Sequence, residues 1–323
     1  MTTLQENVTS TERKTDAYET LLHRCGGLEP IATAVAYPCE RTALAGVVEA
    51  AEAGLLAPIL VGPAQKIRAV AEAEGLNIDP YPIEEAPDGP KSAARAVALV
   101  REGRAEAVMK GSLHTDELMG AVVSSSAGLR TGRRVSHAFV MSVPTYHKPL
   151  IVTDAAINIA PTLDEKRDIC QNAIDLARSL GRERPKVAIL SAVETVTTRI
   201  PSTIDAAALC KMAERGQITG GVLDGPLAMD NAISAEAAKT KGIASPVCGD
   251  ADILLAPDLE AGNILAKQLT FLARADAAGL VLGARVPVIL TSRADNVRVR
   301  MASCGVALLV AHARRAGQVE VQA

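Results

Sequence analysis

The stretch VPVILTSRADN, residues 286–296, joins a predicted strand to a predicted helix. Its apolar and largely β-branched start predicts a buried strand over residues 287–291, and hydroxyl, basic and acidic side chains follow immediately. The residues that come next, VRVRMASCGVALLVAHARR (297–315), have the pattern of a long helix, for which Asp295 or Asn296 is a suitable N-cap. The stretch therefore predicts a strand, a short polar turn and a helix in succession.

The same succession of strand and helix recurs along the whole chain. Unalternating apolar runs predict nine further strands, and amphipathic, alanine-rich segments predict helices between most of them. This order is typical of an α/β fold with an open parallel or mixed sheet. The other predicted strands are 31–36, 58–62, 106–110, 137–143, 149–153, 186–190, 220–224, 252–256 and 280–283, and the clearest predicted helices are 42–55, 90–103, 164–181 and 260–275.

Ten strands are many for one sheet, so we expect two sheets in two domains. The predicted strands 137–143 and 149–153 are separated only by PTYHK, residues 144–148. That gap is too short for a crossover helix, so these two strands are antiparallel or belong to different domains. A domain boundary near residue 145 fits this gap.

Composition narrows the classes of function that the chain can have. The 323 residues carry a formal net charge of −3 and only 2% aromatic residues, which argues against nucleic acid as the main partner. The six cysteines are spread over the chain without a C-x-x-C pair, so buried reduced thiols are expected. Residues 1–15 form a polar tail without an apolar signal core, and no stretch is apolar enough to span a bilayer. A cytoplasmic protein is the simplest expectation.

Polar residues follow six of the predicted strands directly. Open α/β sheets bind ligands beyond the carboxyl ends of their strands, so these residues are candidates for a shared cleft. Turn chemistry alone can explain any one of them. The six groups are Lys110-Gly111-Ser112, Thr153-Asp154, Ser191, Asp224-Gly225-Pro226, Pro257-Asp258 and Thr291-Ser292-Arg293.

The turn after residue 291 suits an anion. A helix N-terminus presents unpaired N–H groups and a partial positive charge, which favour phosphate. The guanidinium of Arg293 can hold phosphate through two hydrogen bonds, and Ser292 can donate to an oxyanion. The alternative is an ordinary connection in which Asp295 caps the helix and Arg293 lies in solvent.

Two further loops contain weaker candidates for binding residues. In MKGSLHTDE (109–117), Gly111 permits close backbone approach and Ser112 is small and polar, but the pattern is not a Walker A loop. The loop GLRTGRRVSH (128–137) concentrates three arginines that could grip a polyanionic ligand or simply face solvent. These arginines are Arg130, Arg133 and Arg134.

Other site types lack the required spacing. No G-x-G-x-x-G follows a predicted strand, and no G-x-S-x-G elbow is present, so a Rossmann dinucleotide site and a serine hydrolase are disfavoured. The five histidines show no ligand spacing, and we expect no metal site.

These pieces resemble the phosphate acetyl/butyryltransferase family over nearly the whole chain. The resemblance implies two open α/β domains with a cleft between them, on a fold shared with isocitrate and isopropylmalate dehydrogenases. It also implies that the C-terminal helix folds back, which gives domains of 16–145 plus 293–323 and of 146–292. The matching stretches are KGSLHTDELM (110–119), GLRTGRRVSH (128–137), YHKPLIVTDAAINIAP (146–161), DGPLAMDNAIS (224–234), ADILLAPDLEAGNILAK (251–267) and PVILTSRADN (287–296).

The resemblance further implies a reaction. Acyl-CoA and inorganic phosphate would form acyl phosphate and CoA reversibly, by direct transfer in a ternary complex and without a tightly bound cofactor. Arg293 matches the phosphate-binding arginine of the family, and Ser292 matches the serine thought to stabilise the transition state. Lys110, Gly111 and Ser112, together with the three arginines of the 128–137 loop, are then candidates for binding CoA and phosphate. Family members are commonly homodimers.

One mismatch concerns the base for the CoA thiol. In the acetyltransferases of the family an aspartate follows the Ser-Arg pair by several residues, but here those positions hold Val297, Arg298 and Val299. Asp295 is the nearest carboxylate, so either it takes this role or another group does. This departure is closer to the butyryltransferase-like pattern, and acetyl, propionyl and butyryl groups all stay open as substrates.

Two other functions stay open from the sequence. One is an NAD(P)-dependent hydroxy-acid dehydrogenase on the same fold, although neither its aspartate cluster nor its cofactor loop is visible. The other is a non-catalytic acyl-CoA-binding protein, which the missing late aspartate would explain.

Overall fold

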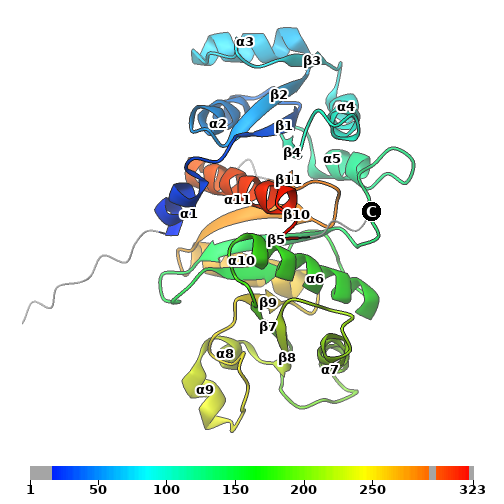
Figure 1. The fold of residues 1–323 in the computed structure, drawn as a ribbon, viewed down its shortest axis with the longest axis vertical. Helices are drawn as coiled ribbons and strands as arrows, with labels where there is room; N and C mark the ends of the chain where they lie inside the picture. Colours follow the sequence, from blue (N-terminus) through cyan, green and yellow to red (C-terminus); the bar gives the residue numbers. More distant parts are fainter. Residues whose placement is uncertain (1–16, 291–295, 320–323) are drawn as a thin grey trace, which may run out of the picture.

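The computed structural model describes residues 17–290 and 296–319, and its strands form one continuous sheet (Figure 1). The strand order is β3-β2-β1-β4-β11-β10-β5-β6-β9-β7-β8. The strands are β1 (Ile31–Ala36), β2 (Leu56–Gly62), β3 (Ile83–Glu85), β4 (Ala107–Lys110), β5 (Ser136–Ser142), β6 (Leu150–Thr153), β7 (Lys186–Leu190), β8 (Val222–Leu227), β9 (Ile253–Leu255), β10 (Asp276–Leu282) and β11 (Val288–Ile289).

Helices cover both faces of this sheet. In the described part of the chain none of them is long and apolar enough to cross a membrane. They are α1 (Ala17–Cys25), α2 (Arg41–Glu52), α3 (Ala64–Glu74), α4 (Gly89–Arg101), α5 (Thr115–Val122), α6 (Leu163–Ser179), α7 (Pro201–Glu214), α8 (Met229–Ile233), α9 (Ala235–Thr240), α10 (Leu259–Phe271) and α11 (Val297–Arg315).

The two halves of the sheet run in opposite directions. β1, β2, β3, β4 and β11 are parallel to one another, and β6, β9, β7 and β8 form a second parallel set. β10 lies between the halves and is antiparallel to both β11 and β5. β5 and β6 are antiparallel, which confirms the prediction from the short gap between them. The expectation of two separate sheets is wrong, because β10 pairs with β5 along its whole length.

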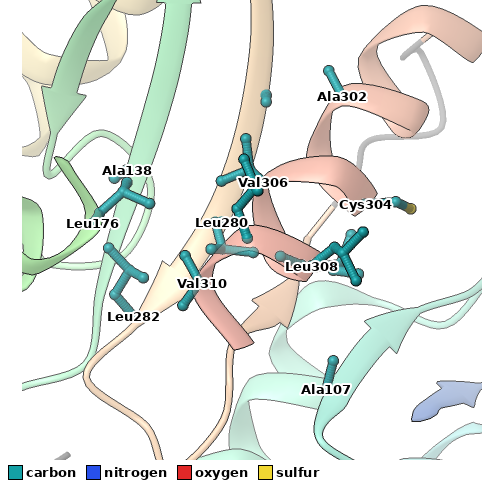
Figure 2. Close-up of a cluster of buried hydrophobic side chains, with 14 of the residues drawn as sticks. Ala107, Ala138, Leu176, Leu280, Leu282, Ala302, Cys304, Val306, Leu308 and Val310 are labelled. Carbon is teal, nitrogen blue, oxygen red and sulfur yellow. The ribbon is translucent and has the colours of Figure 1, made fainter. Parts of the chain in front are cut away.

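The helix predicted over residues 297–315 is confirmed as α11, and it lies at the centre of the core. It packs against β10, α1, α2 and α6. Figure 2 shows Val306 and Val310 beside Leu280 and Leu282 of β10. Asn296, not Asp295, is the N-cap, and its side-chain oxygen accepts a hydrogen bond from the Val299 N–H at 2.9 Å. The division into two domains, with this helix returned to the first, stays a prediction.

The cysteines follow the sequence expectation. All six are free thiols; Cys25, Cys39, Cys170 and Cys304 are buried, and the other two are half-buried. Burial raises the pKa of Cys39 to about 11 and that of Cys304 to about 12, so these thiols are protonated at neutral pH and behave as small apolar side chains.

Strand alternation separates the core into layers on the two faces. Along β4, Ala107 and Met109 join the cluster that contains α11 and α6, whereas Val108 joins the cluster under α4 and α5. A third cluster lies under α8 and α10. The side chain of a strand residue can therefore be assigned to one face by its position in the strand.

Helix α10 approaches the end of β6 closely, and Gly262 permits this approach. A Cβ atom at residue 262 would lie 2.2 Å from the Asp154 carbonyl oxygen and 3.1 Å from Ala256 Cβ. The neighbouring Asn263 donates from Nδ2 to the Ala155 carbonyl at 3.0 Å. The glycine therefore lets the helix backbone rest on the loop that follows β6.

We predict that Gly262→Ala lowers the free energy of unfolding by about 1–3 kcal/mol, because the added methyl group must displace backbone. Gly120→Ala is the matched control, since Gly120 also lies inside a helix but no heavy atom lies within 4 Å of its added Cβ. The control should be neutral or stabilise the protein by up to about 1 kcal/mol. Urea unfolding of both variants measures the difference, and equal midpoints would contradict the tight contact.

Candidate active site

The carboxyl ends of β4 and β11 lie side by side. Val108 pairs with Val288 and Met109 with Ile289 in parallel register, so Lys110 and Leu290 leave the sheet at the same edge. Leu290 is the last described residue before the Thr291–Asp295 segment. The predicted residues Ser292, Arg293 and Asp295 lie outside the described part of the chain.

Lys110, Gly111 and Ser112 form a tight connection to the end of β1. Lys110 is only 7% exposed, and its Nζ donates to the carbonyl oxygens of Gly111 at 3.2 Å and Leu113 at 3.3 Å. A Cβ at residue 111 would lie 2.4 Å from the Ala36 carbonyl oxygen, so glycine is required here. Gly111 was predicted to let backbone come close to a partner; that partner is the backbone of Ala36 and Tyr37.

Ser112 completes this connection. Its hydroxyl donates to the Tyr37 carbonyl at 2.7 Å and accepts from the Cys39 N–H at 3.1 Å. Tyr37 itself has a φ of 55°, a conformation uncommon for a residue with a Cβ. The two hydrogen bonds of the Ser112 hydroxyl therefore join the loop after β4 to the loop after β1.

A large cavity opens beside the first two turns of α11. Its volume is about 1020 Å³. Its described walls come from α1, the end of β5 with the turn into β6, the end of α6, the start of β10, and α11. Arg298, Val299 and Ala302 are the contribution of α11. The cavity is therefore next to Asn296, where the chain leaves the Thr291–Asp295 segment.

Basic side chains surround this cavity. Arg24, Arg182 and Arg274 are exposed and line it, and Arg274 has a φ of 55°. The Arg182 Nε lies 3.7 Å from Asp252 Oδ1, and the Arg24 guanidinium donates to the Leu180 carbonyl at 2.8 Å. This distribution of charge suits an anionic ligand.

An ion pair joins two walls of the cavity. Arg298 Nε lies 2.9 Å from Asp276 Oδ2, which ties the first turn of α11 to the start of β10. The Arg298 guanidinium also lies 4.2 Å from the ring centroid of Tyr18 in α1, a cation–π contact. Lys148 also lines the cavity, and its Nζ lies 2.8 Å from both Asp250 and Asp252.

The three arginines of the 128–137 loop have other surroundings. Arg133 forms an ion pair with Asp175 of α6, and Arg134 donates from Nε to Asn158 Oδ1 at 2.7 Å. Arg134 also lies 3.1 Å from Glu165. Arg130 is exposed and bridges to Ala284. None of these three is among the described residues that line the large cavity.

Asp154, at the end of β6, is a buried hydrogen-bond centre. It is 3% exposed and accepts from the backbone N–H groups of Ala156 at 2.8 Å, Ile157 at 3.0 Å and His137 at 3.2 Å. Asn158 donates to it as well. Burial lowers the pKa of His137 to about 4, so its imidazole is neutral at neutral pH. The carboxylate is thus stabilised by N–H donors.

Metal ligation finds no support in the described residues, where no three His, Cys, Asp or Glu side chains cluster suitably. The sequence analysis missed the cavity arginines, because Arg182 and Arg274 lie between elements and belong to no motif. Their position is the signal that could have found them, since Arg182 lies between α6 and β7 and Arg274 lies between α10 and β10.

Comparison with known proteins identifies relatives of the whole chain. A family model described as phosphate acetyl/butaryl transferase matches residues 88–307. The phosphate acetyltransferase of Rhizobium meliloti is 64% identical over 302 residues, which cover 94% of this chain and 96% of that protein. The phosphate butyryltransferase of Clostridium acetobutylicum is 42% identical, with 86% and 92% coverage.

Solved structures agree on the fold. The branched-chain phosphotransacylase from Enterococcus faecalis V583 superposes with a TM-score of 0.76 at 30% identity, over 87% of this chain and 99% of that one. A 4-hydroxythreonine-4-phosphate dehydrogenase from Klebsiella pneumoniae superposes with a TM-score of 0.54 at 14% identity, over 88% and 99% of the two chains. The second likeness shows only that the expected dehydrogenase-like architecture is shared. On the sequence matches, the chain belongs to the phosphate acetyl/butyryl transferase family.

Proposed function

We propose that this protein transfers an acyl group reversibly between CoA and inorganic phosphate. The observation that carries the proposal is the cavity of about 1020 Å³ beside α11, with a basic rim and an apolar floor. A volume of this size accommodates a large cofactor-like ligand. Acetyl is the first expected acyl group, since the phosphate acetyltransferase of Rhizobium meliloti is 64% identical to this chain.

The Ser-Arg segment supplies the proposed chemistry. Arg293 holds the phosphate by two hydrogen bonds, and the N-terminus of α11 adds a partial positive charge. Ser292 donates to the oxyanion that forms when the thiol or phosphate attacks the carbonyl. Direct transfer in a ternary complex needs only that both substrates are held in attacking geometry. Asp295 is the acid closest to this pair in the sequence and is one candidate base.

CoA occupies the large cavity in this proposal. Arg24, Arg182 and Arg274 offer guanidinium groups to its phosphates, and the apolar floor of Val140, Ile151 and Ala278 contacts its uncharged part. No tightly bound cofactor and no metal is part of the mechanism.

The remaining predicted binding residues divide into two groups. Lys110, Gly111 and Ser112 stay candidates on the phosphate side, because they leave the sheet at the edge where Leu290 does. Arg130 is exposed and stays a candidate for CoA. We propose that Arg133 and Arg134 act mainly on the fold, since α6 and Asn158 engage their side chains.

We propose that the protein is a homodimer and that it is located in the cytoplasm. Free cysteine thiols are expected in a reducing compartment. Helix α10 exposes apolar side chains that no described residue covers: Ile264 and Phe271 lie seven residues apart on one face, and Leu272 follows. Phe271 is 78% exposed, so a second copy of the chain is the proposed cover.

Release of CoA from acetyl-, propionyl- and butyryl-CoA, followed with a thiol reagent, tests the function. Release should require phosphate, and the ratio of kcat/KM values names the acyl group. Folded protein that releases no CoA from any of the three would refute the proposal. An absorbance rise at 340 nm with NAD(P)+ and a hydroxy acid would instead favour the dehydrogenase alternative.

Variants of the Ser-Arg pair test the chemistry. Ser292→Ala should lower kcat by about 100- to 1000-fold, the usual effect of removing an oxyanion donor. Arg293→Ala should raise the KM for phosphate strongly, because a bidentate contact is lost. Steady-state kinetics with phosphate varied measures both, and thermal unfolding should match the wild type. Kinetics like those of the wild type in both variants would remove the pair from the mechanism.

Variants of the cavity rim test the CoA site. Arg274→Gln should raise the KM for CoA by about 10-fold, which corresponds to one charge-assisted hydrogen bond. Arg199→Gln is the control, because Arg199 is also exposed but is not among the described residues that line the cavity. Initial rates with CoA and acetyl phosphate give both constants. An equal change in the two variants would place CoA elsewhere.

A charged substitution on α10 tests whether this helix forms the dimer interface. Phe271→Asp should halve the mass measured by light scattering at micromolar concentration, since a carboxylate would be buried without a partner. Val196→Asp is the control, because Val196 is also an exposed apolar residue but lies away from α10. If Phe271→Asp keeps the mass of the wild type, α10 does not form the interface.

A further inference from the structure

A second, much smaller cavity lies where α6, the end of β10 and the last turns of α11 meet. Its walls also include the loop before β5, and its volume is about 20 Å³. A water molecule needs about 10–15 Å³ measured in this way, so the small cavity holds one water or one monatomic ion. Since β10 joins the two halves of the sheet, the small cavity lies beside that junction.

Two guanidinium groups and one carboxylate face the small cavity. Arg133, Asp175 and Arg314 are the charged residues among its described lining residues. Arg133 and Asp175 form an ion pair, and their side chains are only 15% and 13% exposed. The second oxygen of Asp175 accepts from Gln171 Nε2 at 3.1 Å. The ion pair is neutral as a unit, so Arg314 leaves the small cavity with an excess positive charge.

The guanidinium of Arg314 is only partly satisfied. Its Nη1 donates to the Arg285 carbonyl at 3.0 Å, whereas its Nε is buried and has no hydrogen-bond partner in the described chain. Burial lowers the pKa of Arg314 to about 10; Asp175 opposes this shift and Arg133 adds to it. Arg314 is therefore still charged at neutral pH. A buried, charged N–H group without a partner is unfavourable, so the small cavity favours a ligand that accepts a hydrogen bond.

The hydroxyl groups beside the small cavity are already used as donors. Thr131 Oγ1 donates to the Gly283 carbonyl at 2.7 Å, and Ser179 Oγ donates to the Asp175 carbonyl at 2.9 Å. Among the lining groups described, the Nε of Arg314 is the donor that stays available.

Charge and size together select the ligand. A water molecule would accept the hydrogen bond from Arg314 but leave the excess charge, whereas a monovalent anion satisfies both. Phosphate and sulfate are too large for about 20 Å³. Leu176, Leu282 and Val310 give the small cavity apolar walls, which favour a weakly hydrated anion.

We propose that the small cavity binds one small monovalent anion, such as chloride, through Arg314 Nε. The anion offsets the excess positive charge and links α6 to the end of α11, so it stabilises the junction of the two halves. This site is separate from the large cavity proposed for CoA. Ala302 lines the large cavity and Val310 the small one, and eight residues of helix span about 12 Å.

Thermal unfolding of the full chain tests the site. Sodium gluconate is replaced stepwise by sodium chloride at constant ionic strength, because gluconate is too large for the small cavity. The Tm of the wild type should rise by about 2–4 °C and then level off, as expected for a bound ligand. Bromide should act in the same way, and crystals soaked in bromide should show an anomalous-scattering peak beside Arg314 Nε.

Two variants should change the response in opposite directions. Arg314→Met removes the donor and the excess charge, so the rise in Tm with chloride should disappear. Asp175→Asn keeps the shape but adds one positive charge, so half-saturation should need about 10-fold less chloride. Arg315→Met is the control, because Arg315 lies on the same helix and pairs with Glu106 but is not among the described lining residues. Its response should equal that of the wild type.

Several results would overturn the proposal. A Tm of the wild type that ignores chloride and bromide would show that the small cavity holds water or nothing. A rise that persists unchanged in Arg314→Met would be a general salt effect, and a bromide peak without a change in Tm would mean an adventitious ion only. A response seen only in Glu320→Gln would show that this carboxylate, next to Val319 in the sequence, supplies the negative charge instead.

Discussion

The antiparallel pairing of β10 with β5 is the contact on which the rest of the molecule depends. Each half of the sheet is a parallel set whose strands run opposite to those of the other half. Only a strand that is antiparallel to a member of the first set and to β5 can join them, and β10 does so over residues 276–282. Helix α11 then covers the junction with a nearly continuous buried face.

This junction also determines where the cavity lies. β5 and β10 extend past the ends of β4 and β11. The cavity is bounded by the end of β5, the start of β10, the turn into β6 and the start of α11. Residues of α1 and of the end of α6 also line it. The Ser-Arg segment joins β11 to α11, so its two anchors are parts of the core.

Much of the fold could be predicted, because the signals for single helices and strands lie within short segments of the sequence. The range 297–315 matches α11 because the apolar pattern, the capping Asn296 and the basic last turn all lie within one segment. The antiparallel pairing of β5 with β6 follows from a gap too short for a helix. The single sheet could not be predicted, because the pairing of residues 276–282 with 136–142 joins segments far apart in the sequence.

Candidate site residues could be predicted only where they belong to a recognisable sequence motif. Gly111 has the tight backbone approach that its sequence context suggested, although the partner is the chain itself. The role of Arg133 and Arg134 toward a polyanion stays a prediction; α6 supplies a carboxylate to each of them, and no pattern in the loop could reveal those partners. Arg274 and Asp276 belong to no motif, and only the folded chain brings them to the cavity.

The proposed function depends on CoA binding in the cavity beside α11, which hydrogen exchange with and without CoA can detect. Adding CoA should slow hydrogen exchange in α1, in the turn between β5 and β6, and in the first turns of α11. Protection confined to the loop of residues 128–137, with no change around α11, would contradict it.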